Sequence, residues 1–191
     1  MKGKLIILTG PSGAGKSTIA KHLLKIKDFN LVFSISACSR KKREGEVDGK
    51  DYFFYSIDTF KTKIEENEFL EWEEVYPQHY YGTLRSQVEE LRSSGKNVVF
   101  DVDVMGGINI KREYKENAIS IFISPPSIEE LELRLKSRNT ESQENISRRL
   151  RKAKMEMAYA KKFDQIIEND KLDNALKTAD SIVAEFLQSE K

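Results

Sequence analysis

The amino-acid sequence predicts an α/β protein with three layers, in which helices cover both faces of a mostly parallel β-sheet. Short apolar runs that end in turn residues alternate with stretches of helical periodicity, as in parallel strands joined by crossover helices. One interval, about residues 34–83, breaks this alternation and predicts an inserted subdomain. The chain has 191 residues, enough for one well-cored domain and short for two.

Four apolar runs are candidate strands. Residues 4–9 form a continuous run followed by Gly-Pro-Ser-Gly, which predicts a buried strand that ends in a loop. Residues 97–102 and 120–124 repeat the pattern, and Pro125-Pro126 ends the second of these runs. Residues 165–167 are a weaker candidate.

A helical pattern lies next to each of the first three runs, after the first and third and before the second. We expect helices over residues 16–24 and over 87–92, the latter ending at Gly95. Ser127-Ile128-Glu129-Glu130 matches a capping box that opens a helix towards Lys136. From residue 172 to 187 the apolar residues recur three and four apart, as on one helix face.

The interval 34–83 is rich in Gly, Tyr, Phe and charge, with short alternating pieces such as residues 52–55. We interpret it as a partly antiparallel subdomain over one end of the main sheet.

The charges nearly cancel, since 32 Lys and Arg stand against 31 Asp and Glu, a net charge of +1. A general polyanion binder needs a large positive excess, so we expect no nucleic-acid partner. The single cysteine, Cys38, excludes an internal disulfide and predicts a reducing, cytoplasmic environment. The early apolar run Leu5–Leu8 is too short for a signal peptide or a membrane-spanning helix, so we expect no membrane association.

A phosphate-binding loop joins the first strand to the first helix. The pattern G-x-x-x-x-G-K-[ST] is matched by Gly10, Pro11, Ser12, Gly13, Ala14, Gly15, Lys16 and Ser17. Glycines let successive N–H groups surround phosphate oxygens, and the helix N-terminus adds its positive dipole end. Lys16 can reach the β- and γ-phosphates of ATP, and the Ser17 hydroxyl can ligate Mg²⁺. A chance match in a chain of this length has a probability of roughly 1% or less.

The loop alone does not identify the phosphate acceptor. GTP-binding switch proteins carry an Asn-Lys-x-Asp motif, and the nearest segment here, Asn169-Asp170-Lys171, does not match. Large motor ATPases need a longer chain. A short chain with an inserted subdomain therefore indicates a kinase for a small molecule, with the insert binding the acceptor.

Residues 34–52 resemble the guanylate kinase signature S-x-[ST]-x-x-x-R-x-x-R-x-G-E-x-x-G-x-D-Y. Glu71-Trp72, Tyr80-Tyr81-Gly82-Thr83 and Asp101-Val102-Asp103 continue the resemblance in register, so that it covers nearly the whole chain. It implies ATP-dependent phosphorylation of GMP to GDP. It also implies a core (about 1–33, 84–133 and 155–191), a GMP-binding insert (about 34–83) and a helical lid (about 134–154).

The resemblance also assigns the GMP site. It implies that the phosphate is held by Arg40, Arg43, Tyr52 and Tyr81, that guanine is read by Ser36, Glu71 and Thr83, and that Glu46 and Asp103 lie on the GMP side. The chemistry agrees, because two arginines three apart present forked donors to a phosphate. A carboxylate accepts from the guanine N1–H and 2-amino groups, and a hydroxyl donates to O6.

For the donor side, the resemblance places Arg134, Arg138 and Arg149 over the ATP phosphates. It assigns Asp101, Asp103 or both to the metal and acceptor region, and we take Ser17 and Asp101 as the Mg²⁺ ligands, with the division between the two aspartates left open. The chain departs from the family pattern at Cys38-Ser39, at Lys42 and at Asn139. The sequence leaves open whether the chain forms a homo-oligomer.

Two alternatives remain at this point. Related P-loop enzymes phosphorylate other small molecules, although Glu71 with Ser36 favours guanine. Some guanylate-kinase-like domains are non-catalytic interaction modules, but these typically have a degraded phosphate loop, and this one is complete. RNA binding would need a basic face with exposed stacking aromatics, whereas the aromatic residues of this sequence cluster near glutamates.

Overall fold

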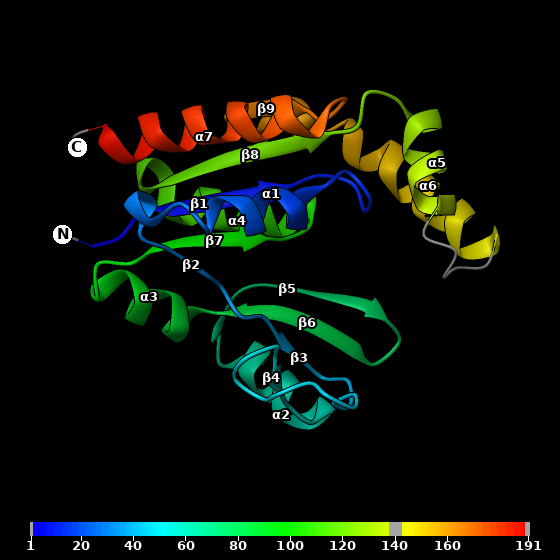
Figure 1. Ribbon diagram of the computed structural model, residues 1–191. Coiled ribbons are helices and arrows are strands. Elements are labelled where there is room, and N and C mark those ends of the chain that lie inside the picture. Colours follow the sequence, from blue (N-terminus) through cyan, green and yellow to red (C-terminus); the bar gives the residue numbers. More distant parts are fainter. Residues whose placement is uncertain (1, 138–142, 190–191) are drawn as a thin grey trace.

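The computed structural model describes residues 2–137 and 143–189. Within them, the central element is a parallel five-stranded sheet with the order β2-β7-β1-β8-β9 (Figure 1). Its strands are β1 (Leu5–Thr9), β2 (Leu31–Phe33), β7 (Asn97–Asp101), β8 (Ala118–Ser124) and β9 (Gln165–Glu168). The structure confirms the four predicted strands and adds β2, whose three residues are too few for a recognisable pattern.

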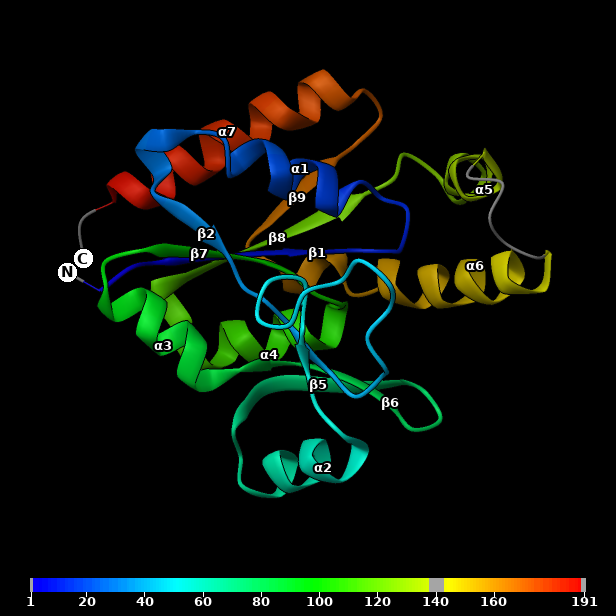
Figure 2. The ribbon, with the colours of Figure 1, turned by 60° about the horizontal axis from the view of Figure 1, so that its bottom comes forward.

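Helices cover both faces of this sheet, which confirms the predicted three layers (Figure 2). Ile6 and Leu8 of β1 pack against helices α1 (Lys16–Leu23) and α7 (Leu172–Gln188) on one face. Leu5 and Ile7 point to the other face, where α3 (Arg85–Ser93) and α4 (Val104–Tyr114) pack. Side chains alternate along a strand, so burial on both sides requires the continuous apolar run seen in β1.

A second, four-stranded sheet has the order β4-β3-β6-β5. Its elements are β3 (Ala37–Cys38), β4 (Phe53–Phe54), α2 (Ile57–Glu65), β5 (Phe69–Tyr76) and β6 (His79–Leu84). β6 pairs antiparallel with β5 and β3, whereas β3 and β4 are parallel, so the interval has the partly antiparallel character that its pattern predicts. Phe60 of α2 stacks on Phe69 at 4.4 Å between ring centroids and gives this sheet a small core of its own.

A helix pair, α5 (Ile128–Ser137) and α6 (Gln143–Met157), extends from the carboxyl edge of the main sheet (Figure 1). The predicted cap is present, because the Ser127 hydroxyl accepts a hydrogen bond of 3.1 Å from the Glu130 N–H. Leu131, Leu135 and Ile146 are buried between the two helices. Short 3₁₀ turns lie at Lys27–Phe29, Lys115–Asn117 and Ala160–Lys162.

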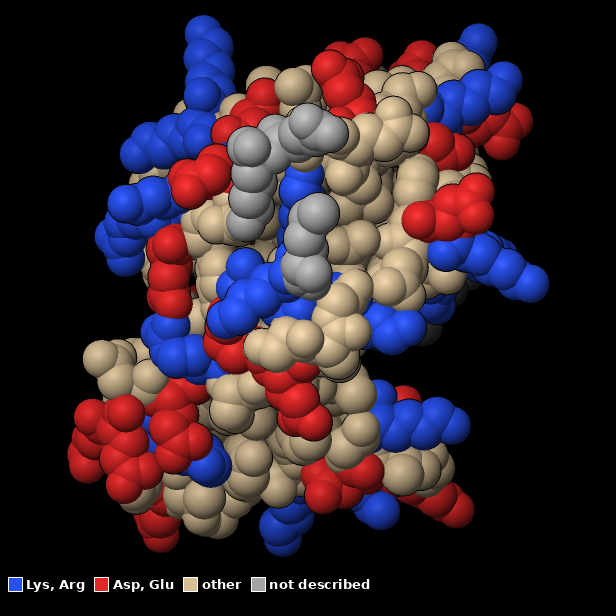
Figure 3. Space-filling view, turned by 90° about the vertical axis from the view of Figure 1, so that its left-hand side faces the viewer, with Lys and Arg blue, Asp and Glu red and all other residues tan. Residues whose placement is uncertain are grey.

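Two surface properties bear on possible partners. On the face that carries the chain ends, Lys and Arg side chains are interspersed with Asp and Glu (Figure 3). Of the helices within residues 2–137 and 143–189, none combines the length and the apolar character needed to cross a membrane.

Candidate active site

The phosphate loop lies at the carboxyl end of β1, between the main sheet and helix α1 (Figure 1). Its glycines Gly10, Gly13 and Gly15 have φ angles of 131°, 94° and 103°, a region that residues with side chains rarely adopt. A Cβ atom on Gly10 would lie 2.2 Å from the Ile123 carbonyl oxygen. Glycine is therefore required there to let the loop pass close to β8.

Lys16 curls back over this loop. Its ammonium group donates to the carbonyl oxygens of Gly10 (2.8 Å) and Pro11 (3.1 Å) and lies 4.0 Å from the Asp101 carboxylate. Burial lowers the pKa of Lys16, and Asp101 partly offsets that effect. The lysine is thus a poorly hydrated cation held at the position where the motif predicts a phosphate contact.

Ser17 and Asp101 meet at the same edge of the sheet. The Ser17 hydroxyl donates a hydrogen bond to the carboxylate of Asp101, the last residue of β7. Across residues 2–137 and 143–189, no group of three or more His, Cys, Asp or Glu could hold a metal ion. One hydroxyl and one carboxylate still suit Mg²⁺, which keeps several waters and takes further oxygens from nucleotide phosphates.

A cavity of about 210 Å³ opens beside this pair, and we call it the donor cavity. Its lining consists of Gly10, Ser12, Lys16, Asp101, Val102, Asp103, Arg149, Lys152 and Glu156. Arg149 reaches it from α6 and donates to the Ser12 hydroxyl at 3.4 Å. The donor cavity therefore brings the loop, the end of β7 and the helix pair together.

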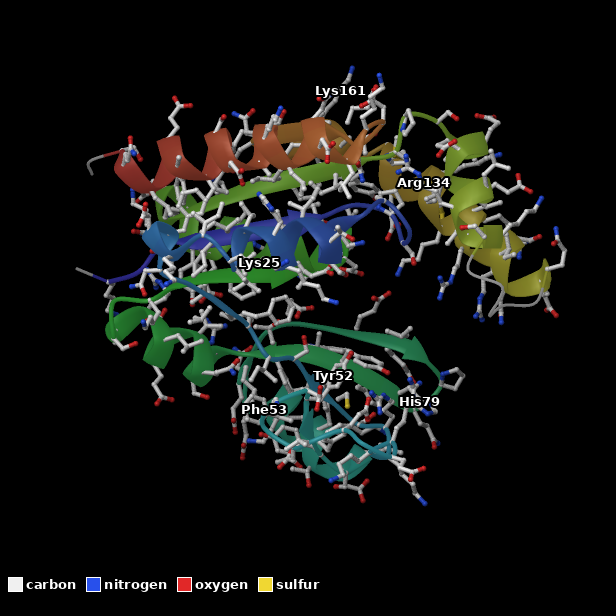
Figure 4. The ribbon with its side chains drawn as sticks, in the orientation of Figure 1. Lys25, Tyr52, Phe53, His79, Arg134 and Lys161 are labelled. Carbon is white, nitrogen blue, oxygen red and sulfur yellow. The ribbon has the colours of Figure 1, made fainter. Side chains whose placement is uncertain are left out.

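Of the other two predicted lid arginines, the structure describes one. Arg134 of α5 is outside the lining of the donor cavity and donates instead to the Asn169 carbonyl oxygen (2.8 Å) and to Glu130 (3.0 Å). Figure 4 shows it at the base of the helix pair. Arg138 falls outside the described residues.

A second cavity, of about 180 Å³, adjoins the first, and we call it the acceptor cavity. Its lining consists of Ser36, Tyr52, Glu71, Glu73, Tyr81, Gly82, Asp101, Val102 and Asp103. Residues Asp101, Val102 and Asp103 line both cavities. The segment after β7 is therefore the wall that the two cavities share.

Glu71 stands at the base of the acceptor cavity, on β5. Its carboxylate accepts a 2.5 Å hydrogen bond from the hydroxyl of Thr83, a buried residue on β6. Burial raises the pKa of Glu71 to about 7, and the nearby carboxylates of Asp103 and Glu73 add to the increase. Both Glu71 and Asp103 rest against Gly106 of α4, and the Asp103 carboxylate caps that helix by accepting from the Gly106 N–H at 2.7 Å.

Arg40 lies outside the lining of the acceptor cavity and contacts four side chains of the second sheet and its loops. It makes a bidentate ion pair with Glu46 (2.7 and 2.5 Å), donates to the Tyr81 hydroxyl (3.2 Å) and lies over the rings of Tyr52 (4.9 Å) and Phe54 (5.5 Å). Hydrogen bonding to Glu46 raises the pKa of Arg40, and the same pair lowers the pKa of Glu46 to about 2. Figure 4 shows Tyr52 among the side chains of the second sheet.

Arg43 follows on the loop after β3. Its backbone N–H donates to Glu46 at 2.8 Å, and its side chain is exposed. Arg40 and Arg43 also line a separate, open cavity of about 800 Å³ on the second sheet. The structure thus joins Arg40, Glu46, Tyr52 and Tyr81 in direct contacts and leaves the Arg43 side chain at the surface.

Sequence reasoning missed four residues of this region. Lys152 and Glu156 line the donor cavity, Glu73 lines the acceptor cavity, and Asn169 donates from its side chain to the Ala14 carbonyl oxygen at 2.8 Å. In the sequence, Lys152 is one of eight basic residues between positions 134 and 154 and Glu73 is one of six glutamates between 65 and 74. The only available signal was the helical register, which places Lys152 and Glu156 on one face of α6.

Comparisons with known proteins agree on one family. The family model described as guanylate kinase matches residues 2–188. The guanylate kinase of Bacteroides thetaiotaomicron is 53% identical over 190 residues, covering 100% of this chain and 93% of that protein. The guanylate kinase of Porphyromonas gingivalis is 49% identical over 184 residues, covering 96% and 98%. The crystal structure of guanylate kinase from Anaplasma phagocytophilum has a TM-score of 0.75 at 28% identity, covering 98% of this chain and 88% of that chain.

Proposed function

The chain belongs to the guanylate kinase family, and on that premise we propose how its two cavities transfer the γ-phosphoryl group of ATP to GMP, giving ADP and GDP. The second sheet with its loops (about 34–83) is the insert that binds GMP, and the helix pair (about 134–154) is the lid over ATP. The single cysteine, Cys38, is buried and free, which supports a reducing, cytoplasmic location.

One observation carries the proposal: the donor and acceptor cavities share the wall Asp101-Val102-Asp103. A γ-phosphate held by the loop and an acceptor phosphate held by the insert would therefore meet beside this wall. Phosphoryl transfer depends chiefly on such alignment and on neutralising charge.

On the donor side, three groups bind and neutralise the ATP phosphates. Lys16 would leave the Gly10 and Pro11 carbonyl oxygens for the β- and γ-phosphates, and its low hydration makes that exchange favourable. Arg149 contributes a second positive charge from the lid, which also carries Arg134; Arg138, predicted for the same role, lies outside the described residues. Ser17 and Asp101 would hold Mg²⁺, which would supply further neutralisation of the phosphate oxygens.

On the acceptor side, the residues divide between phosphate and base. Arg40, already oriented by Glu46 and stacked on Tyr52, would bind the GMP phosphate together with Arg43, Tyr52 and Tyr81. The Glu71 carboxylate would accept from the guanine N1–H and 2-amino groups, with Thr83 fixing its position and Ser36 donating to O6. Asp103 lines the same cavity and orients the end of α4.

The attacking oxygen belongs to a phosphate that is already ionised, so the transfer step requires no general base. The protein supplies alignment, positive charge and exclusion of water. Water that entered between lid and insert would accept the phosphoryl group instead of GMP. Closure of the two parts would therefore prevent hydrolysis of ATP.

The test is ADP release with GMP, AMP, CMP and UMP as acceptors, for wild type and two variants. We expect activity with GMP, loss of nearly all activity in Lys16→Ala with an unchanged circular dichroism spectrum, and a reduced preference for GMP over AMP in Glu71→Ala. Release with another acceptor alone would indicate a different small-molecule kinase. No release with any acceptor would indicate a binding module.

A further inference from the structure

An ion pair joins the lid to the insert. The Lys152 ammonium of α6 lies 2.9 Å from the Glu73 carboxylate of β5, 3.8 Å from Asp103 and 4.0 Å from Glu156. Lys152 and Glu73 are 79 residues apart, and Figure 1 shows that their elements belong to separate parts of the molecule. The pair is therefore a tertiary link between two parts that each bind one substrate.

The position of the pair relates it to both cavities. Lys152 lines the donor cavity and Glu73 lines the acceptor cavity, so their contact crosses from one to the other beside Asp103. Glu156, on the same face of α6, is buried next to the lysine. A shift of α6 towards bound ATP would thus move the group that holds β5.

The charges give Lys152 a second effect. Glu71, Glu73, Asp101 and Asp103 all line the acceptor cavity, into which a phosphate dianion must pass. Without the ammonium group, Glu73 and Asp103 would face that phosphate uncompensated and repel it. Lys152 lowers this repulsion only while the lid is close to the insert.

We propose that Lys152, through Glu73, is a positioning residue that couples ATP binding in the donor cavity to GMP binding in the acceptor cavity. The inference rests on the proposed assignment of the two cavities. Coupling of this kind is reciprocal, so each nucleotide tightens the binding of the other by the same factor.

The experiment is calorimetric titration of GMP with and without a saturating, non-hydrolysable ATP analogue and Mg²⁺. The proteins are wild type, Lys152→Met, Glu73→Gln, the double variant and the conservative Lys152→Arg. Lys154→Met is the matched control, because Lys154 is an exposed lysine on the same helix that lines neither cavity. The readout is the ratio of the two GMP dissociation constants.

We expect the analogue to tighten GMP binding about fivefold in wild type, the upper end for a partly exposed ion pair. The ratio should fall below about twofold in Lys152→Met, in Glu73→Gln and in the double variant alike, and stay near the wild-type value in Lys152→Arg and Lys154→Met. An unchanged ratio in Lys152→Met, or tighter GMP binding in that variant without the analogue, would overturn this inference alone. A wild-type protein that does not bind GMP would overturn the proposed function as well.

Discussion

Glu71 is a carboxylic acid with unfavourable surroundings for its own charge. It is partly buried and lies near the carboxylates of Asp103 and Glu73. The Thr83 hydroxyl stabilises the charged form of Glu71 by donating a hydrogen bond to it. With a pKa of about 7, Glu71 is partly protonated in the free protein near physiological pH. In the proposed site, guanine presents two donors and favours the carboxylate, so GMP binding and protonation of Glu71 would oppose each other.

GMP binding should therefore weaken as the pH falls below about 7, by about tenfold per pH unit from this group. The GMP phosphate also titrates, with a second pKa near 6. Glu71→Gln separates the two effects, because it keeps the phosphate titration and removes the carboxyl. Titrations between pH 6 and 8 should show a steeper pH dependence in wild type than in Glu71→Gln, and parallel profiles would contradict the assignment.

The same residue should make stability depend on pH. The ordinary pKa of a glutamate, 4.5, applies in the unfolded chain, and folding raises it to about 7, so folding favours the protonated form. The stabilisation is complete below pH 4.5, declines as the pH rises and is lost above about 7. Glu71→Gln should equal wild type near pH 4.5 and exceed it at pH 8 by up to about 3 kcal/mol. Thermal unfolding at both pH values measures this, and a difference independent of pH would refute it.

Single residues were predictable where chemistry and spacing repeat a motif. Residues of the phosphate loop line the donor cavity and Glu71 lines the acceptor cavity, whereas Arg40 lies outside both and contacts Tyr52 and Tyr81 of the acceptor cavity. The roles of Lys152 and Glu73 were not predictable from the sequence. They arise from a contact between distant elements, and each residue has several neighbours of the same charge in the sequence.

At the scale of elements, helix α4 packs against two carboxylates that line the acceptor cavity. Asp103 caps the helix, and Gly106 in its first turn lies beneath the carboxylates of Glu71 and Asp103. A Cβ atom at Gly106 would be 2.9 Å from Glu71 Oε2 and 3.2 Å from Asp103 Oδ1. These are ends of side chains, which can move.

Gly106→Ala should therefore fold but displace Glu71. Alanine favours the helix by up to about 1 kcal/mol, which offsets the local crowding, so the melting temperature should change little. The KM for GMP should rise about tenfold, because a carboxylate displaced by a few tenths of an ångström no longer meets both guanine donors. The KM for ATP is the internal control. Equal increases in both KM values would show that the glycine acts on the fold rather than on Glu71.

The elements themselves were predictable where hydrophobic patterns were strong. Apolar runs predicted β1, β7, β8 and β9, and spacing of three and four predicted α7. Helix α4 was missed because Gly106-Gly107 weakens its intrinsic helical signal. Helix α2 was missed because its three apolar residues, Ile57, Phe60 and Ile64, stand among charged and polar ones.

At the scale of the whole molecule, the apolar interior is divided. The central sheet has two buried clusters, one of which includes Leu70 of the insert, and the insert and the lid each have a further cluster of their own. Independent clusters allow the parts to open locally without loss of the main core. The relative placement of the parts was not predictable, since no sequence pattern encodes which charged residues meet across them.

Ile146→Ala should loosen the lid alone. The side chain is 5% exposed and packs within the lid cluster, so its truncation removes about 2–5 kcal/mol from that cluster. Hydrogen exchange should accelerate in residues 128–137 and 143–157 and stay unchanged in β1 and β8. Ile6→Ala, in the central core, is the contrasting variant and should accelerate exchange throughout. Identical exchange maps for the two variants would show that lid and core open together.

Strand β6 ends at Leu84 and helix α3 begins at Arg85, with no intervening residue. The far end of α3 is anchored, because the buried Arg92 donates to the Gly3 carbonyl oxygen at 3.0 Å and lies over the Tyr114 ring at 4.7 Å. On this side, the insert is therefore joined to the core directly through a helix whose far end is fixed. Because no loop residue lies at this junction, a rotation of the insert relative to the core would have to twist α3 or change the backbone angles of residues 34–36, which form the opposite connection.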